Sequence, residues 1–326
     1  MKHYTGINDI GNLQQAVKEA LELKNDKLKY RALGKDKTIC LLFFNNSLRT
    51  RLSTQKAAQN LGMDVIVMNF GSEGWALEYD DGTVMDQGKS EHVKEAAQVV
   101  SQYATVIGIR AFAGLEDKEK DAAELVLNSF VKYASVPIVN MESSLQHPLQ
   151  CLTDAITMEE YKIVGRKPKV VLSWAPHPKA LPHAVANSFI NMMQLQDADF
   201  VITHPIGYEL DPKITKDILI EYDQEKAFEN ADFVYVKNWS SYRDYGQIKC
   251  TDPNWMITAS KMKVTNNGKF MHCLPVRRNV VVTDEVIDSK NSLVIKQAAN
   301  REFAAQIVLK KILENDETNS SENRRT

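Results

Sequence analysis

The chain lacks the features that define several large classes of protein. No apolar run among its 326 residues approaches about 18 residues, the length of a membrane-spanning helix, so we expect no membrane span. Its four cysteines form no Cys-x-x-Cys pair, which disfavours a zinc site or a redox dithiol. The formal net charge of -2 favours neither nucleic acid nor an anionic membrane as a partner. Because residues 1–6 show no signal-peptide pattern either, we expect a reduced, cytoplasmic protein.

The glycine patterns of nucleotide-binding enzymes are missing or incomplete. No Gly-x-Gly occurs, although the Rossmann dinucleotide fingerprint requires it. Residues 82–90 read Gly-Thr-Val-Met-Asp-Gln-Gly-Lys-Ser and come close to a P-loop. Five residues separate these glycines where the motif needs four, and no strand pattern leads into Gly82. A nucleotide-binding enzyme is therefore a weak alternative.

Apolar residues are present in two successive series of alternating strand and helix patterns, joined by a helix predicted at 148–161. The strands are predicted at 38–44, 64–68, 105–109 and 136–140 in the first series, and at 169–173, 200–204, 233–237, 269–272 and 292–295 in the second. This alternation predicts an α/β protein with two doubly wound parallel-sheet domains.

The same patterns predict the domain boundaries. The first domain is predicted at residues 1–147, together with a C-terminal helix at about 298–315 that returns to it. The second is predicted at residues 148–297. Residues 316–326 carry no apolar pattern, so we expect a disordered tail.

A polar turn at residues 45–51, between the first strand and the next helix, is the first candidate site. Helix N-termini attract anions because their free N–H groups and the helix dipole point outward. Ser47 and Thr50 add hydroxyl groups, and Arg49 and Arg51 add guanidinium groups suited to phosphate. The alternative is an ordinary capped helix start with two solvated arginines.

Polar residues also follow the other predicted strands, and ligands of doubly wound sheets bind at the carboxyl ends of strands. These residues are Arg110, Glu142, His147-Pro148-Leu149-Gln150, Trp174-Ala175-Pro176-His177-Pro178, Lys237-Asn238-Trp239 and His272-Cys273-Leu274-Pro275. Each has a structural alternative: Arg110 could pair with a local carboxylate, His147 could cap a helix, and Cys273 could be a small buried residue. Their common position at strand ends favours one site.

Taken in order, these stretches resemble the carbamoyltransferase family across residues 1 to about 315. The turn is similar to the family's Ser-Thr-Arg-Thr carbamoyl-phosphate loop, with Leu48 in place of the first Thr. The stretches around Trp75, Trp174, Asn187-Ser188-Phe189 and Lys237 resemble the branch that acts on Nα-acylated ornithine. The Asp-x-x-x-Ser-Met-Gly loop of ordinary ornithine carbamoyltransferases is absent, which disfavours free ornithine as the substrate.

The resemblance implies that carbamoyl phosphate donates its carbamoyl group to the δ-amine of an acylated ornithine, in arginine biosynthesis, with no metal and no organic cofactor. It implies that Thr50, Arg110 and His147 are catalytic and stabilise the oxyanion of the tetrahedral intermediate. The implied contacts to carbamoyl phosphate are Ser47, Leu48, Arg49, Thr50, Trp75, Arg110, His147, Gln150, Cys273, Leu274 and Arg301. It also implies a homotrimer in which Trp75 reaches into a neighbouring subunit, and an active site between the two domains.

For the second substrate, the resemblance implies contacts from Glu142, His177, Lys237, Arg278, Phe112, Pro178 and Ser90. Lys237 and Arg278 are suited to carboxylates, although Arg277-Arg278 could equally be a solvated pair after the strand. Glu142 could hold an amide N–H.

The acyl group is predicted from two positions. In this branch the residue before Glu91-His92 is glutamate in the acetyl type and proline in the succinyl type, and here it is Ser90. A glutamate would repel a succinyl carboxylate, whereas serine does not. Val281 stands where acetyl-type enzymes carry a lysine. We therefore expect Nα-succinyl-L-ornithine as the preferred substrate, with Nα-acetyl-L-ornithine as the alternative and a non-catalytic carbamoyltransferase-like protein as a more distant one.

Overall fold

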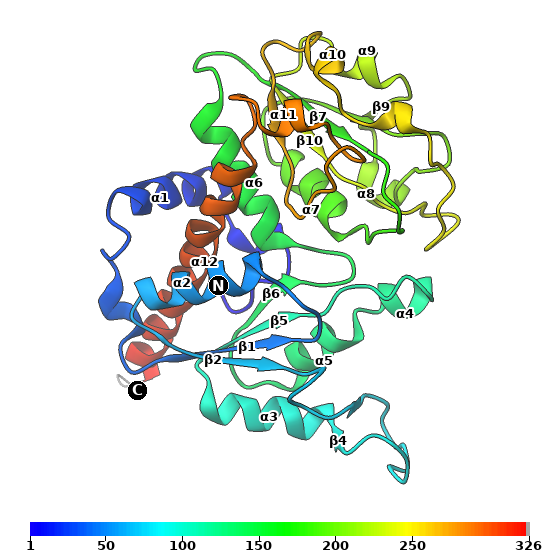
Figure 1. The fold of residues 1–326 in the computed structure, drawn as a ribbon. Helices are drawn as coiled ribbons and strands as arrows, with labels where there is room; N and C mark the ends of the chain where they lie inside the picture. Colours follow the sequence, from blue (N-terminus) through cyan, green and yellow to red (C-terminus); the bar gives the residue numbers. More distant parts are fainter. Residues whose placement is uncertain (324–326) are drawn as a thin grey trace. The chain divides into compact units, whose positions relative to one another are not determined.

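The computed structural model describes the backbone of residues 1–323 and the side chains of residues 1–316. The chain divides into two compact units (Figure 1). Unit 1 comprises Met1–Ala113, Glu119–Leu152 and the residues from Arg301 onward, and unit 2 comprises Gly114–Lys118 and Thr153–Asn300. The main crossings between the units lie within two helices, α6 (Pro148–Tyr161) and α12 (Val294–Asn323).

Unit 1 is built on a four-stranded parallel sheet in the order β2-β1-β5-β6. Its strands are β1 (Thr38–Phe43), β2 (Asp64–Asn69), β5 (Val106–Arg110) and β6 (Ile138–Glu142). The last five residues of β1 are all buried, as expected for a strand covered on both faces. The other elements are η1 (Ile7–Ile10), α1 (Leu13–Asn25), η2 (Arg31–Gly34), α2 (Arg49–Asn60), β3 (Leu77–Glu78), β4 (Glu91–His92), α3 (Val93–Tyr103), α4 (Lys118–Ala122) and α5 (Leu125–Tyr133).

Helices cover both faces of the unit 1 sheet. Residues of α3 and α5 pack with Cys40 and Leu42 of β1 in one apolar cluster. Figure 1 shows α1, α2 and α12 on the opposite side of the sheet. Asn60 of α2 donates to Glu302 and Gln306 of α12 at 2.7 and 3.1 Å, so α12 is tied to unit 1 by side-chain bonds. The expected return of the last helix to the first half of the chain is thus confirmed.

Unit 2 is built on a five-stranded parallel sheet in the order β11-β10-β7-β8-β9. Its strands are β7 (Lys169–Ser173), β8 (Asp199–Thr203), β9 (Leu219–Glu221), β10 (Phe233–Val236) and β11 (Lys269–Met271). Its helices are α7 (Ala184–Met193), α8 (Pro212–Thr215), α9 (Gln224–Phe228), η3 (Pro253–Trp255), α10 (Ala259–Met262) and α11 (Asp284–Ile287).

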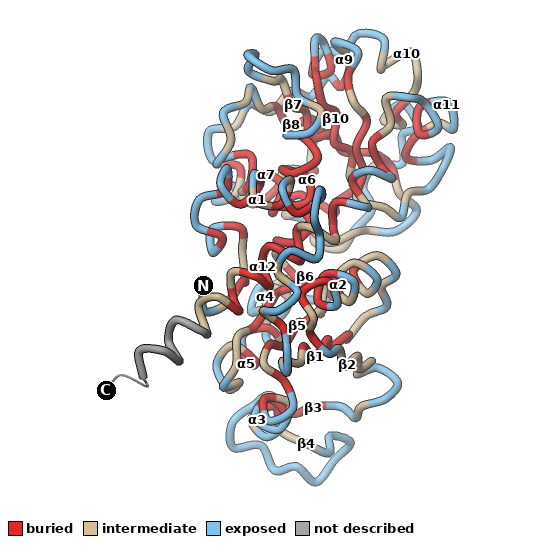
Figure 2. The backbone as a smooth tube through the Cα atoms, turned by 90° about the vertical axis from the view of Figure 1, so that its left-hand side faces the viewer, coloured by how far each residue is buried: buried red, intermediate tan, exposed pale blue. Residues whose placement is uncertain are grey.

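The alternation of side chains along β10 places two layers on this sheet. Val234 and Val236 belong to the apolar cluster that includes residues of α9 and α11. Tyr235, between them, stacks on Phe189 of α7 with ring centroids 4.2 Å apart. Figure 2 shows buried stretches along the strands of this unit and in α7. The prediction of an α/β protein with parallel sheets is confirmed.

The secondary structure differs from the prediction in places. Residues 292–295 form no strand: Ser292 makes a single bridge to Phe270, and α12 starts at Val294. The short strand β9 was not predicted. A disordered tail was expected at residues 316–326; α12 continues to Asn323, and residues 324–326 lie outside the described part.

A helix that has already nucleated gains one hydrogen bond for each residue added, which explains how α12 extends past its apolar stripe. Lys310 and Glu314, four residues apart, form an ion pair at 2.8 Å that supports this extension. Among the described residues, no helix is both long and apolar enough to cross a bilayer.

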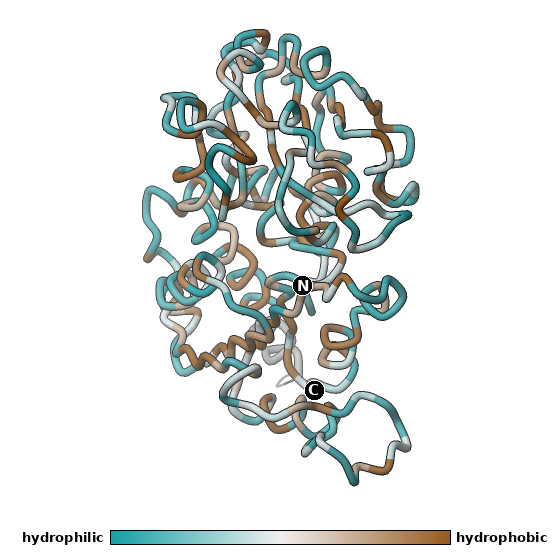
Figure 3. The backbone as a smooth tube through the Cα atoms, turned by 45° about the vertical axis from the view of Figure 1, so that its right-hand side comes forward, coloured by the Kyte–Doolittle hydropathy of each residue, from teal (hydrophilic) through white to brown (hydrophobic). Residues whose placement is uncertain are grey.

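The segment between β2 and α3 is the most exposed part of unit 1. β3 and β4 form a two-stranded parallel pair, and residues 79–90 loop out between them. Figures 2 and 3 show this loop as largely exposed and mostly hydrophilic, with isolated apolar positions. One of these, Val84, is 77% exposed.

Candidate active site

The polar turn at residues 45–51 lies between a strand and a helix, as the sequence predicts. β1 ends at Phe43, and α2 begins at Arg49. The Ser47 hydroxyl accepts a hydrogen bond from the Thr50 backbone N–H at 3.2 Å, which fixes the first turn of α2. Leu48 points outward with 66% of its surface exposed, whereas Thr50 is buried. Position 48 therefore contributes its backbone to this turn.

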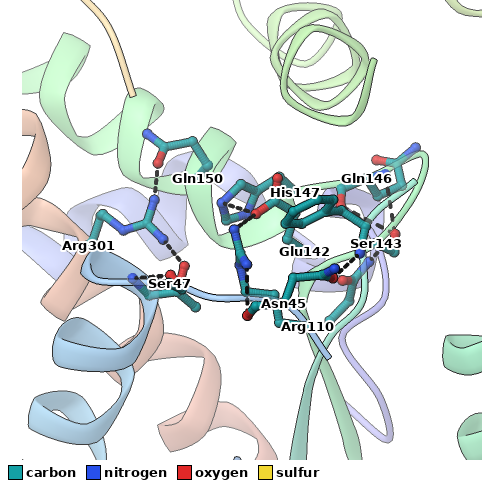
Figure 4. Close-up of polar contacts among 12 residues, drawn as sticks. Asn45, Ser47, Arg110, Glu142, Ser143, Gln146, His147, Gln150 and Arg301 are labelled. Carbon is teal, nitrogen blue, oxygen red and sulfur yellow. Dashed lines mark hydrogen bonds and ion pairs between the residues drawn. The ribbon is translucent and has the colours of Figure 1, made fainter. Parts of the chain in front are cut away.

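Arg301 of α12 joins this turn to α6. Its guanidinium donates to Thr50 Oγ1 at 2.7 Å and also to Gln150 Oε1. All three side chains are nearly fully buried, with at most 5% exposure. Both bonds go to neutral oxygens, so they hold the guanidinium in place and keep its positive charge beside the N-terminus of α2. Figure 4 shows Arg301 between Gln150 and the Ser47 turn.

Arg110, at the end of β5, faces the same turn from the other side. Its Nη1 donates to the carbonyl oxygens of Asn45 and Asn46 at 3.1 and 2.7 Å. Its Nη2 lies 2.8 Å from Glu142 Oε2, and its guanidinium lies 4.8 Å from the centroid of Phe112. Its Nε is buried and has no hydrogen-bond partner within the described residues. Arg110 is thus held on three sides and retains one N–H donor.

Glu142 connects Arg110 to His147. Its Oε2 lies 3.7 Å from His147 Nε2, and the imidazole is only 4% exposed. The turn between Glu142 and His147 is closed by a 2.7 Å bond from Ser143 N to Gln146 O, and Ser143 Oγ accepts from Gln146 N at 3.2 Å. Figure 4 shows Arg110, Glu142 and His147 grouped around this turn. Glu142 therefore holds the Arg110 guanidinium by an ion pair and lies close to His147. The local carboxylate that the sequence allowed as a partner of Arg110 is Glu142, which the resemblance had implied as a contact to the second substrate.

Two residues important to the sequence prediction lie elsewhere in unit 1. Trp75 is 59% exposed, and its indole N–H donates to Glu91 at 2.8 Å. Ser90 is exposed, and its backbone N–H donates to Ala76 O at 3.3 Å. Trp75 therefore lies just before β3 and Ser90 just before β4, and both belong to the exposed β3–β4 segment.

In unit 2, His177 and Pro178 line an open cavity of about 610 Å³. Its walls also include Pro176, Thr251, Val276, Arg277, Arg278 and Val280. Arg277 Nε donates to His177 Nε2 at 3.2 Å, and His177 Nδ1 lies 2.8 Å from Lys179 O. The Lys179 backbone N–H lies 3.1 Å from the same Nδ1, so His177 is held by the backbone of Lys179 on one side and by Arg277 on the other.

The electrostatics around His177 are positive. Burial lowers the pKa of the imidazole, and the charges of Lys237, Arg277 and Lys179 lower it further. Lys237 follows β10, and its backbone N–H donates to Ser173 O at 3.0 Å. A cavity bordered by several cations and a neutral histidine is suited to a ligand with carboxylate groups.

Arg278 has a different environment from the one predicted. Its Nη1 lies 2.8 Å from Asp284 and its Nη2 lies 2.6 Å from Asp288, so its charge is already paired. These bonds hold the pKa of both aspartates below their ordinary values. Arg277, which the sequence prediction left out, carries the cation bonded to His177. Phe112 lies in unit 1, where the Arg110 guanidinium is 4.8 Å from the centroid of its ring.

The predicted carbamoyl-binding turn of unit 2, His272 to Pro275, follows β11. The His272 Nδ1 accepts from the Leu274 backbone N–H at 2.9 Å, which closes the turn on itself. Leu274 has a φ of 56°, an uncommon value for a residue with a side chain. Cys273 is a free cysteine of intermediate burial. Within the residues that the structure describes, no group of three or more His, Cys, Asp or Glu could hold a metal ion.

Comparisons with known proteins identify the family to which the chain is similar. Residues 2–160 match the family model "Aspartate/ornithine carbamoyltransferase, carbamoyl-P binding domain", and residues 182–312 match "Aspartate/ornithine carbamoyltransferase, Asp/Orn binding domain". The chain is 54% identical over 317 residues to an N-succinylornithine carbamoyltransferase of Bacteroides fragilis (strain 638R), covering 97% of this chain and 99% of that one. It is 36% identical over 323 residues to an N-acetylornithine carbamoyltransferase of Xanthomonas campestris pv. campestris, covering 92% and 94%.

Two solved structures are similar over nearly the whole chain. One is a glutamate-to-alanine mutant of N-acetyl-L-ornithine transcarbamylase complexed with carbamyl phosphate and N-succinyl-L-norvaline, with a TM-score of 0.90, 35% identity and coverage of 96% of this chain and 100% of that chain. The other is acetylornithine transcarbamylase complexed with acetylcitrulline, with a TM-score of 0.90, 35% identity and coverage of 96% and 99%.

Proposed function

This chain belongs to the aspartate/ornithine carbamoyltransferase family, and we propose that it transfers the carbamoyl group of carbamoyl phosphate to the δ-amine of Nα-succinyl-L-ornithine. The products are Nα-succinyl-L-citrulline and phosphate, and the reaction belongs to arginine biosynthesis. One observation carries the choice of substrate: identity is 54% to an N-succinylornithine carbamoyltransferase and 36% to an N-acetylornithine carbamoyltransferase, both over more than nine-tenths of the chain.

Unit 1 is proposed to bind carbamoyl phosphate. The phosphate would bind at the N-terminus of α2, where Ser47, the Leu48 backbone and Arg49 supply donors and Arg301 supplies charge. The carbamoyl oxygen would face Thr50, Arg110 and His147, and Arg110 Nε–H has no acceptor among the described residues. Because Glu142 already holds the Arg110 guanidinium in place, little reorganisation of Arg110 would be needed when negative charge develops.

The proposed chemistry needs no separate protein base. The uncharged δ-amine attacks the carbamoyl carbon, a C–N bond forms, and the carbonyl oxygen becomes an oxyanion. The C–O bond to phosphate then breaks, and a phosphate oxygen accepts the amine proton. Gln150, with the backbone of Cys273 and Leu274, would orient the carbamoyl amide. Catalysis then depends mainly on orientation and charge stabilisation.

Unit 2 is proposed to bind the acylated ornithine in the cavity beside His177 and Pro178. Nα-Succinyl-L-ornithine has two carboxylates and the acetyl compound has one. The cations that act on His177 are Lys237, Arg277 and Lys179, which suits the dicarboxylate. Arg278, paired with two aspartates, would instead shape the cavity wall.

The proposed reader of the acyl group is Ser90. In the similar structure a glutamate is replaced by alanine and a succinyl compound is bound, which fits the idea that a glutamate hinders succinyl binding in the acetyl-type enzyme. Ser90 is small and uncharged, so it offers neither bulk nor repulsion to a succinyl carboxylate.

We also propose a cytoplasmic homotrimer in which Trp75 completes the carbamoyl-phosphate site of a neighbouring subunit. The support is the exposure of Trp75 on the β3–β4 segment of its own chain. Sedimentation that detects an active monomer would exclude this arrangement.

The experiment that tests the reaction is a phosphate-release assay on the purified protein. Phosphate should form only when carbamoyl phosphate and Nα-succinyl-L-ornithine are both present, and free L-ornithine should give little product. No release with any acylated ornithine would favour the non-catalytic alternative, and equal release without an amine acceptor would indicate a simple phosphatase.

A further inference from the structure

The turn from His272 to Pro275 is linked through hydrogen bonds to two buried polar side chains of unit 2, which form a chain with His272. Gln297 Nε2 donates to Asp154 Oδ1 at 2.7 Å, and Gln297 Oε1 accepts from the His272 backbone N–H at 3.0 Å. Asp154, Gln297 and His272 are 0%, 1% and 3% exposed. The amide group of Gln297 thus donates to a side chain of α6 and accepts from the backbone of the turn.

The chain of hydrogen bonds continues from His272 to Leu274, whose backbone conformation is unusual. The His272 ring accepts from Leu274 N at 2.9 Å, and Leu274 has its φ at 56°. A residue with a side chain rarely adopts this conformation unless its surroundings impose it. Two hydrogen bonds supply that constraint. The His272 backbone N–H donates to Gln297, and the His272 ring accepts from the Leu274 backbone N–H.

Asp154 also explains why the amide of Gln297 has one orientation. A buried carboxylate can only accept hydrogen bonds, so the Nε2 group of Gln297 must face it and the Oε1 group must face His272. Burial, and then the charges of Asp154 and Cys273, raise the pKa of the Tyr235 hydroxyl well above its ordinary value.

We propose that Gln297, oriented by Asp154, is a positioning residue that holds the 272–275 turn in the geometry required to orient the carbamoyl group. This inference rests on the proposed function, in which the Cys273 and Leu274 backbone contacts the carbamoyl amide. Neither Gln297 nor Asp154 touches the substrates. Their effect on the reaction passes through the backbone of the turn.

The test starts with Gln297→Leu, which keeps the volume and removes both hydrogen bonds. In the substrate-free protein, hydrogen exchange at the amides of His272 and Leu274 should accelerate, because the first loses its acceptor and the second its fixed histidine. kcat/KM for carbamoyl phosphate should fall on the order of 10- to 100-fold, as small misplacements of a reacting group typically cause. KM for the acylated ornithine should change little.

Two matched variants separate positioning from folding. Asp154→Asn keeps an oxygen that can accept from Gln297, so it should retain most of the wild-type kcat/KM. The double variant Asp154→Asn/Gln297→Leu removes the buried charge that loses its Gln297 donor in Gln297→Leu, so its Tm should rise above that of Gln297→Leu. Its kcat/KM for carbamoyl phosphate should stay low, since the His272 amide still lacks its acceptor.

Two results would overturn the inference. One is unchanged exchange at His272 and Leu274 in Gln297→Leu, because the turn would then not depend on Gln297. The other is kcat/KM that recovers together with Tm in the double variant, because Gln297 would then serve stability alone. If the wild-type protein shows no carbamoyl transfer, the proposed function fails, whereas the exchange rates still report whether Gln297 holds the turn.

Discussion

At the scale of single residues, the partners of each arginine decide what it can do for a substrate. Arg278 is paired with Asp284 and Asp288, whereas Arg277, one residue earlier, is bonded to a neutral histidine. The sequence prediction chose Arg278 from the pair Arg277-Arg278 and left Arg277 out. The pairing of Arg278 depends on Asp284 in α11 and on Asp288 just after it, and no local sequence pattern shows that these aspartates reach Arg278. The same limit applies to Arg110: the sequence allowed a local carboxylate as its partner but did not show that this carboxylate is Glu142.

The two neighbouring arginines give a matched comparison. Arg277→Ala should raise KM for Nα-succinyl-L-ornithine about 10-fold or more, because a charge-assisted hydrogen bond is worth roughly 1.5–3 kcal/mol. Arg278→Ala should have the smaller effect on KM, since its charge already serves Asp284 and Asp288. Steady-state kinetics of both variants checks this. A larger KM effect at Arg278 would show that it exchanges its aspartates for the substrate.

Arg110 and Arg49 should differ in which kinetic constant they affect. Arg110→Ala should lower kcat on the order of 10²-fold, as removal of one oxyanion donor typically does. Arg49→Ala should raise KM for carbamoyl phosphate and lower kcat together, because it would hold the phosphate in both the ground state and the transition state. Near-normal kinetics in both variants would refute the assignment of the carbamoyl-phosphate site to unit 1.

At the scale of elements, strands with continuous apolar runs were predictable and short or ambiguous ones were not. β1 and β7 are nearly fully buried, and their sequences show it directly. β9 has only three residues, none of them buried, so its sequence gives no strand signal. Residues 292–295 are apolar enough for a strand, but a short apolar run cannot distinguish a strand from the start of a helix. The preceding bridge at Ser292 ends the sheet, and α12 then begins.

The β3–β4 segment is the element on which acyl selection is expected to depend. Ser90→Glu should move the ratio of kcat/KM values towards Nα-acetyl-L-ornithine, because the new carboxylate would repel a succinyl carboxylate. Ser90→Gln is the matched control, with similar volume and no charge, and it should shift the ratio much less. An unchanged ratio in Ser90→Glu would show that this position does not read the acyl group.

At the scale of the whole molecule, histidines of unit 2 should make the free energy of unfolding depend on pH. Burial lowers the pKa of His177, His183 and His204 in unit 2 below the ordinary value of 6.5. Below about pH 6.5 the unfolded chain therefore binds more protons at these residues than the folded protein does.

The free energy of unfolding should consequently decrease as the pH falls through about 6.5 towards the lowered pKa values. Urea unfolding at a series of pH values measures this, and His183→Gln should reduce the slope because it removes one of the three groups. His183 is a suitable choice, since its Nε2 lies 2.7 Å from Ser240 O and a glutamine amide can make the same bond. Stability that is constant or rises in this range would contradict the account.

The most direct test of the account is a side-by-side measurement of kcat/KM for Nα-succinyl-L-ornithine and Nα-acetyl-L-ornithine, with carbamoyl phosphate saturating and citrulline product quantified. The charge around His177, the uncharged Ser90 and the 54% identity to an N-succinylornithine carbamoyltransferase all predict a higher value for the succinyl compound. A clear preference for the acetyl compound would contradict the proposed substrate while leaving the carbamoyl transfer itself in place.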